Sequence, residues 1–96
     1  HIASIAKIQL QALRERLARM DLELAVSDPA LAELAKVGFD PVFGARPLKR
    51  AIQQRIENPL SRQLLEGKFP PKTRIEVSVD PVRNPGVFDF AGQAID

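Results

Sequence analysis

Apolar residues near the start of the chain recur with the 3.6-residue period of an amphipathic helix, which predicts a helix over residues 2–20. The inward-facing stripe of this helix consists of Ile2, Leu10, Leu13, Leu17 and Met20. Ile5 lies at the edge of the stripe, whereas Ile8 falls on the polar face. A lone exposed isoleucine is common on protein surfaces. Alternatively, Ile5 and Ile8 belong to a second contact surface for another domain or subunit, and the pattern leaves both interpretations open.

Two later segments alternate between apolar and polar residues, as half-buried strands do. They span residues 22–26 and 73–80, and the second alternation is the clearer one. The predicted inward positions are Leu22, Leu24 and Val26, then Thr73, Ile75, Val77 and Val79. The turn signal at residues 84–86 indicates that residues 87–90 return as a hairpin strand. Residues after Phe90 carry little signal.

A second helix is predicted after the first strand. Either Ser27 or Asp28 can cap it, and Pro29 is tolerated in its first turn because its missing N–H has no partner there. Leu31, Leu34 and Ala35 face the core. Gly38 is predicted to end this helix in a left-handed conformation.

The longest helix is predicted to start at Pro47, which is suited to the first helical position. Its apolar face consists of Leu48, Ala51, Ile52 and Ile56, with a continuation through Leu60, Leu64 and Leu65. A kink is expected at Asn58-Pro59, because Pro59 cannot donate to the carbonyl four residues back. Gly67 stops the helix. The predicted fold is therefore α+β, with about three helices packed on a small three-stranded sheet.

Length and composition limit both the domain count and the chemistry. Ninety-six residues make a single domain, 1–96, and 45% hydrophobic with 27% charged residues is an ordinary globular balance. The chain has no cysteine, and its single histidine is His1, so neither a histidine-based triad nor a cysteine or histidine metal site is expected. No apolar run is long enough to cross a membrane. Because it begins at His1 without an initiator methionine, the chain looks like a piece of a longer protein. The lack of cysteine and of a membrane span fits a cytoplasmic location.

The positive charge is concentrated in one part of the sequence. Between Arg46 and Arg74 there are eight lysines and arginines against two acids, although the whole chain carries only +2. Such a stretch suits a phosphate group, a nucleic acid or an acidic partner surface. Several of these charges are equally well explained as a solvated helix face.

One arginine stands out within this stretch. Arg46 directly precedes Pro47, so its guanidinium is expected near the positive end of a helix dipole, where anions bind well. Gly44 permits a sharp turn, and the small Ala45 leaves room beside the arginine. Arginine is well suited to phosphate recognition. The alternative is that Arg46 forms an ion pair with Asp40 or another acid of the loop.

The residues around this arginine resemble a known family. Residues 38–53, which read Gly-Phe-Asp-Pro-Val-Phe-Gly-Ala-Arg-Pro-Leu-Lys-Arg-Ala-Ile-Gln, are similar to the C-terminal small (lid) domain of the Clp-family AAA+ ATPases. Residues 54–61 are closer to the ClpB-type, heat-shock-100 disaggregases than to the protease-linked members. Residues 1–10 resemble the entry helix of the small domain in the second nucleotide-binding module. The resemblance covers roughly residues 1–80, and the chain departs from the pattern after Asp80.

This resemblance implies roles that composition does not. Arg46 corresponds to the sensor-2 arginine that reaches the γ-phosphate of ATP, with Gly44 and Ala45 as shaping residues. The parent would be an ATPase, with its magnesium ion bound by the missing large domain, whereas this piece alone is not expected to be catalytic. The implied partners are the chain's own large domain, neighbouring subunits of a homohexamer, unfolded or aggregated polypeptide, and an Hsp70-type chaperone system. No nucleic-acid or membrane partner is implied.

Two other functions remain open at this stage. The first is a small module that binds nucleic acid or a protein partner through the basic residues 46–74. The second is the lid of a protease-linked Clp ATPase rather than of a disaggregase. The chain contains no phosphate-binding Gly-x-x-x-x-Gly-Lys-Ser/Thr loop, so neither function includes independent nucleotide binding of that kind.

Overall fold

The computed structural model describes residues 2–95, with side chains from Ser4 onward. The predictions made for His1 and for the side chain of Ile2 lie outside these described residues. The helical elements are α1 (Ile2–Ala18), α2 (Asp28–Val37), α3 (Leu48–Ile52), the π-helix η1 (Gln53–Glu57) and α4 (Asn58–Leu65). The strands are β1 (Leu22–Val26), β2 (Thr73–Val79) and β3 (Phe88–Ala94). This order confirms the predicted α+β class.

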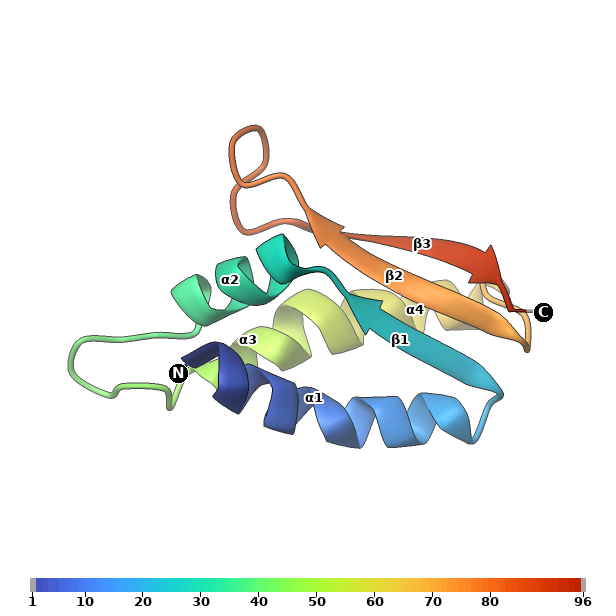
Figure 1. Cartoon of the computed structure of the whole chain (residues 1–96), viewed down its shortest axis with the longest axis horizontal. Coiled ribbons are helices and arrows are strands. Elements are labelled where there is room, and N and C mark those ends of the chain that lie inside the picture. Colours follow the sequence, from blue (N-terminus) through green and yellow to red (C-terminus); the bar gives the residue numbers. More distant parts are fainter. Residues whose placement is uncertain (1, 96) are drawn as a thin grey trace.

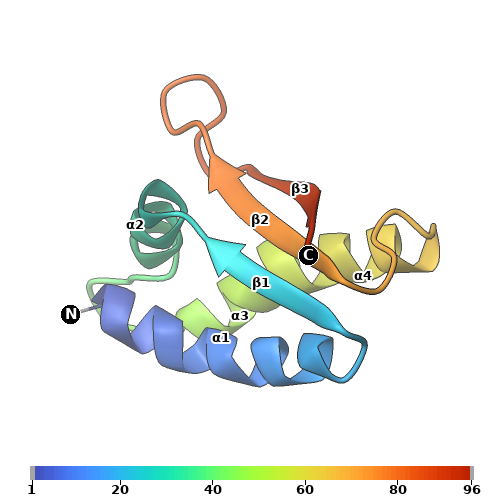
Figure 2. The ribbon, with the colours of Figure 1, turned by 45° about the vertical axis from the view of Figure 1, so that its right-hand side comes forward.

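The three strands form one mixed sheet in the order β1-β2-β3. β1 pairs with β2 in parallel, and β2 pairs with β3 in antiparallel orientation. Alternate residues of β2 are buried, which shows that one face of the sheet is packed and the other is open. Figures 1 and 2 show the continuous helix α3–η1–α4 passing behind the sheet, with α1 running alongside β1.

A single hydrophobic core fills the space between the helices and the sheet. Its largest fully buried side chains are Leu10, Leu17, Leu34, Leu48, Ile56, Leu60, Ile75 and Val77. The first six come from the three predicted helices, and the last two come from the central strand. All the helical elements and all three strands contribute buried side chains, so the hydrophobic patterns located most of the core.

The predicted cap of the second helix is confirmed. Ser27 is the N-cap, and its Oγ accepts a hydrogen bond from the backbone N–H of Ala30 at 3.2 Å. Asp28 and Pro29 follow in the first turn. The serine therefore satisfies an N–H group that has no partner within the helix.

The prediction for Gly38 was wrong. This glycine has φ −93°, not a left-handed value. A Cβ placed on it would lie 2.6 Å from Leu48 Cδ1 and 2.9 Å from Leu48 Cα. The position therefore requires glycine because the end of α2 approaches the start of α3 closely, and not because of backbone conformation.

The end of the first helix also differs from its prediction. α1 ends at Ala18, and Met20, predicted to face inward, is 46% exposed. The N–H groups of Met20 and Asp21 bond to carbonyls only three residues back, and Asp21 adopts φ 63°. The chain is already turning toward β1, so the helical period no longer determines which side chains point inward.

The expected kink at Pro59 takes the form of a π-turn within a continuous helix. The N–H of Asn58 donates to the carbonyl of Gln53, five residues back. Pro59 then occupies the first turn of α4, where its missing N–H is tolerated. The wider π-turn accommodates the proline without ending the helix. Leu60 is buried and Leu64 packs against the core, whereas Leu65 is exposed and Gly67 turns the chain with φ 77°.

The hairpin of β2 and β3 is confirmed and is longer than predicted. Thr73, Ile75 and Val77 are buried, as are Phe88 and Phe90 on β3. The pairing continues past Phe90 to Ala94, which lies opposite Thr73. Residues 91–94 are small or polar, so their strand conformation comes from pairing with β2 rather than from their own pattern.

Candidate functional site

The candidate arginine lies on the loop between α2 and α3, which projects at one end of the molecule (Figure 1). The carboxylate of Asp40 organises this loop. Its Oδ1 accepts hydrogen bonds from the backbone N–H groups of Val42, at 2.7 Å, and Phe43, at 2.9 Å. This arrangement is a side-chain-capped turn of the kind that aspartate favours.

Two backbone hydrogen bonds close the same loop. The N–H of Asp40 donates to the carbonyl of Gly44 at 2.8 Å, and the N–H of Gly44 donates to the carbonyl of Asp40 at 2.7 Å. Gly44 has φ 65°, and nothing lies within 4 Å of where its Cβ would be. Glycine is therefore favoured here by its backbone conformation rather than by crowding, in agreement with the predicted sharp turn.

Arg46 follows this turn and is exposed. Its backbone N–H donates to the carbonyl of Phe43 at 3.2 Å. The guanidinium carbon lies 5.6 Å from the centre of the Phe43 ring, within cation–π range. The backbone bond and the ring contact both position the arginine from within its own loop.

The structure does not support the alternative in which Arg46 pairs with Asp40. Over residues 2–95 the ion pairs are Arg16 with Glu57 and Arg74 with Glu23. The Oδ1 atom of Asp40 is instead bonded to backbone N–H groups of its own turn. The positive charge of Arg46 is therefore available to an anion from outside the described residues.

The helix behind the arginine begins one residue later than predicted. Pro47 has helical dihedral angles, and its carbonyl accepts a hydrogen bond from the N–H of Ala51 at 2.9 Å, although the helix itself starts at Leu48. Leu48 is 1% exposed. Leu48, which directly follows Arg46 and Pro47, is thus anchored in the core and fixes the base of the loop.

Three large apolar side chains of the loop face solvent. Phe39, Val42 and Phe43 are 51%, 82% and 58% exposed. Sequence reasoning did not assign a role to Phe43, although an aromatic residue three positions before a candidate arginine was an available signal. These side chains give the surface around Arg46 an apolar character.

Part of the basic stretch is used inside the fold. Arg55 donates to the carbonyl of Gly86, Lys68 donates to the carbonyl of Phe90 at 3.3 Å, and Arg74 pairs with Glu23 at 3.2 Å. These contacts leave fewer free charges than the sequence count indicates. The interpretation of residues 46–74 as one nucleic-acid-binding surface is correspondingly weaker.

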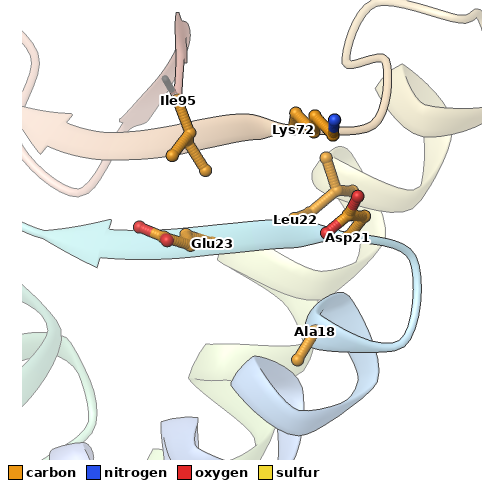
Figure 3. Close-up of a pocket in the computed structure, with 6 residues that line it drawn as sticks. All are labelled: Ala18, Asp21, Leu22, Glu23, Lys72 and Ile95. Atoms are coloured by element: carbon orange, nitrogen blue, oxygen red, sulfur yellow. The ribbon is translucent and has the colours of Figure 1, made fainter.

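A cavity of about 470 Å³ lies at the end of the molecule opposite the α2–α3 loop (Figure 1). It is lined by Ala18, Asp21, Leu22, Glu23, Lys72 and Ile95 (Figure 3). Asp21 and Lys72 both have positive φ, and the N–H of Lys72 donates to the carbonyl of Asp21 at 2.7 Å. This hydrogen bond ties together the starts of β1 and β2, so the cavity marks a structural junction rather than part of the arginine site.

Neither a metal-binding cluster nor a membrane span is found in the part of the chain that the structure describes. Residues 2–95 contain no group of three or more histidine, cysteine or acidic side chains placed to hold a metal ion. Within the same residues no helix has both the length and the apolar character to cross a membrane.

Comparison with known proteins places this loop in a family context. Residues 1–77 match the family model described as the C-terminal, D2-small domain of ClpB protein. The chain belongs to the ClpB D2-small domain family. The match includes the whole of the arginine loop, the entry helix α1 and the long helix behind the sheet.

Curated relatives agree with this assignment. The chain is 62% identical over 79 residues to the chaperone protein ClpB of Vibrio cholerae, which covers 82% of this chain and 9% of the relative. It is 56% identical over 79 residues to ClpB of Pseudomonas putida, with the same coverages. It is 49% identical over 81 residues to ClpB of Meiothermus ruber, which covers 84% of this chain and 10% of the relative.

These matches decide the family but not the role of single residues. They favour ClpB over a protease-linked Clp ATPase, the alternative left open by the sequence. The chain spans only about a tenth of the length of the ClpB relatives that it matches. It is the small domain of the second AAA+ module of a ClpB-type chaperone.

Proposed function

We propose that this chain acts as the lid of the second ATPase module of a ClpB-type disaggregase, in which Arg46 binds the γ-phosphate of ATP held by the large domain. The observation that carries this proposal is the state of Arg46. The side chain is exposed and has no acidic partner over residues 2–95, yet its loop is fixed by Asp40 and Gly44. A charge that is positioned but not neutralised is suited to an incoming anion.

The physical basis is electrostatic stabilisation at a preorganised position. A guanidinium offers a planar set of donors that matches phosphate oxygens, and it stays charged at every physiological pH. Because the loop is closed by its own hydrogen bonds, placing the charge against the phosphate costs little reorganisation. Gly44 supplies the turn, and Ala45 leaves space beside the guanidinium. The magnesium ion of the site would be bound by the large domain.

The buried base of the loop gives the lid a mechanical role. Leu48 anchors the helix that follows Arg46, and that helix crosses behind the sheet to Leu65. A force on the arginine is therefore transmitted to the whole domain rather than absorbed by a flexible loop. Lid movement between nucleotide states would follow from this rigidity.

The partners proposed for the parent protein lie outside the described residues. They are its own large domain, the neighbouring subunits of a homohexamer, aggregated or unfolded polypeptide, and an Hsp70-type chaperone system. A cytoplasmic location fits these partners.

The decisive experiment replaces Arg46 in the full-length parent. Arg46→Ala is expected to slow ATP hydrolysis by the second module about 100-fold, the usual cost of losing one transition-state donor. Arg46→Lys should recover only part of the rate, because an ammonium lacks the planar set of donors. The control is Arg62→Ala, which removes an exposed arginine from α4, away from the Arg46 loop. Steady-state ATPase rates, measured with the first module inactivated, make the comparison.

The isolated chain provides a second readout. Arg46→Ala should leave its melting temperature unchanged, because the side chain is exposed. The isolated 96 residues should show no ATP binding by calorimetry, since one arginine supplies few of the phosphate contacts. Wild-type ATPase rates in the Arg46→Ala parent would overturn the proposal.

Ile8 is proposed as a contact for assembly of the parent. It is 73% exposed on α1, whereas Ile5 packs partly against the core. Ile8→Glu should weaken the full-length hexamer without unfolding the domain, and Gln11→Glu on the same helix is the matched control. Sedimentation velocity of the two parent variants is the measurement. A normal ring with Ile8→Glu would show that this assignment is wrong.

A further inference from the structure

The two edges of the sheet are protected to different degrees. The edge strand β1 has only five residues, includes Glu23, and is flanked by α1 (Figure 1). The edge strand β3 has seven residues and carries a single charge, Asp89, with neither lysine nor proline in the strand. It is the outermost strand, beyond β2 from β1 (Figure 2). Long, nearly uncharged edges of this kind are templates for pairing with another strand.

The hydrogen-bond register identifies the groups that face this free edge. The N–H of Ile95 donates to the carbonyl of Lys72 at 2.9 Å, so these residues form a hydrogen-bonded pair. In an antiparallel ladder hydrogen-bonded and non-hydrogen-bonded pairs alternate. The backbone groups that point away from β2 therefore belong to Phe88, Phe90, Gly92 and Ala94.

An independent contact supports this register. The ammonium of Lys68 donates to the carbonyl of Phe90 at 3.3 Å. That carbonyl is one of the groups assigned to the free edge. Lys68 thus occupies one position of the edge, as lysines do on edge strands that resist pairing.

We propose that a second copy of this chain pairs with β3 in antiparallel orientation, around a two-fold axis at Ala91. This register aligns the whole strand with itself. Phe88 lies opposite Ala94, and Phe90 lies opposite Gly92, so no two large residues are directly opposed. Asp89 lies opposite Gln93, an uncharged hydrogen-bonding residue.

Neighbouring registers are less favourable for the same strand. A two-fold axis at Phe90 would place two Phe90 residues opposite each other, and an axis at Asp89 would oppose two like charges. An axis at Gly92 would leave Phe88 beyond the end of the partner strand. The sequence of β3 is therefore most self-complementary around Ala91. A closed two-fold pair also removes the free edge of both copies.

The inference is separate from the role proposed for Arg46. β3 lies outside residues 1–77, the part that matches the ClpB D2-small family. The arginine loop is far from β3 along the chain, and it contributes no residue to the edge. Pairing through β3 can therefore fail while the proposed function holds, and the reverse is also true.

Lys68 is expected to limit this pairing, because its ammonium must leave the Phe90 carbonyl before a second strand can bond there. Sedimentation velocity of the 96-residue chain over a concentration series should show a weak monomer–dimer equilibrium. Lys68→Ala should tighten the dimer about tenfold, by removing a competing hydrogen bond to the edge. In the dimer the amides of Phe90 and Gly92 should exchange more slowly as the concentration rises.

A proline variant tests the edge directly. The N–H of Ala94 faces away from β2, so Ala94→Pro removes an edge donor without breaking the β2 ladder. It should weaken the dimer about tenfold or more, whereas Ala94→Ser should leave the dissociation constant within about twofold. Far-ultraviolet circular dichroism checks that both variants are folded.

Three results would overturn the proposal. One is a chain that stays monomeric at millimolar concentration both in the wild type and with Lys68→Ala. Another is a dimer whose dissociation constant Ala94→Pro does not change. The third is a dimer that is lost with Ile8→Glu while the Phe90 and Gly92 amides show no concentration dependence, which would place the contact on α1.

Discussion

Two loops of this domain begin with the same three residues, Asp-Pro-Val, and fold in the same way. Asp40 accepts hydrogen bonds from the N–H groups two and three residues ahead, and Asp80 does the same at 3.2 and 3.1 Å. The N–H of the fifth residue then donates to the carbonyl of each aspartate, at 2.7 Å for Gly44 and 2.8 Å for Asn84. Each loop also contains a glycine with positive φ.

The loops differ in what surrounds that glycine. Gly44 has open space around it. The backbone of Gly86 is held from two sides, because its N–H donates to Glu33 Oε2 at 2.6 Å and its carbonyl accepts a hydrogen bond from Arg55. Glu33 belongs to α2 and is 5% exposed, and Arg55 belongs to η1. Helix α2 and η1 thus both bond to the backbone of one loop residue, an arrangement that we call the Gly86 clamp.

The comparison separates the local from the tertiary contribution to loop structure. The Asp-Pro-Val sequence determines the turn in both loops. Only the second loop is fixed to the helices, whereas the first is attached at its base and carries its arginine outward. A loop that must reach a ligand on another domain benefits from lying outside the fold in this way. The Gly86 clamp instead closes the fold beside the β2–β3 hairpin.

The largest expected loss of stability is that of Gly86→Ala, which is measured against the equivalent substitution Gly44→Ala. Gly44→Ala and Gly86→Ala both place a side chain at positive φ, which costs about 1–2 kcal/mol of folding free energy. At Gly86 the new Cβ would also lie 2.8 Å from Arg55 Nη1, and the clamp would have to shift. We expect Gly86→Ala to cost about 1 kcal/mol more than Gly44→Ala. Urea denaturation of both variants gives the difference, and equal losses would show that the clamp contributes nothing.

The next effect concerns the buried carboxylate of the clamp. Glu33→Ala leaves the N–H of Gly86 without its acceptor in a buried place, so the free energy of unfolding should fall by about 2 kcal/mol. Glu33→Gln keeps an oxygen acceptor and should lose about half as much. Thermal and urea unfolding of the two variants test this order. If Glu33→Gln is as damaging as Glu33→Ala, hydrogen bonding to Gly86 is not the reason for the loss.

The smallest effect should come from the shared aspartates. Asp40→Ala and Asp80→Ala each remove two exposed hydrogen bonds, so each should cost about 0.5–1 kcal/mol. The substitutions should differ in their consequence for amide exchange. Without the clamp to hold the loop, Asp40→Ala should speed exchange at Phe43 and Gly44, whereas Gly86 should stay protected in Asp80→Ala. Similar exchange in both loops would contradict the comparison.

Features set by neighbouring residues were predictable from the sequence. The alternation of β2 correctly identified its buried face, and Ser27 was recognised as a helix cap because its acceptor lies three residues from the N–H that it binds. The sharp turn expected at Gly44 was likewise a local property, and this glycine has positive φ. The role proposed for Arg46 comes from the family resemblance, because no pattern in the composition indicates it.

Features set by distant residues were missed. Glu33 and Gly86 are 53 positions apart, and Arg55 and Gly86 are 31 apart, so no local pattern relates them. An acid on the apolar face of α2 was the available signal for Glu33. Gly38 was predicted to adopt a left-handed conformation, because a local pattern does not reveal its close contact with Leu48 in the folded domain. The extension of β3 to Ala94 depends on its partner strand in the same way.

The parallel pairing of β1 with β2 has a consequence for how the chain folds. Glu23 and Arg74, opposite each other in this pair, are 51 positions apart, whereas β2 and β3 are joined by one short loop. Loop closure delays distant contacts more than near ones. The hairpin should therefore form early, and β1 should join it only after α2 and the long helix have been placed. Until β1 pairs, the edge of β2 that faces it stays open. Arg46 lies near the middle of the chain segment that connects these two strands.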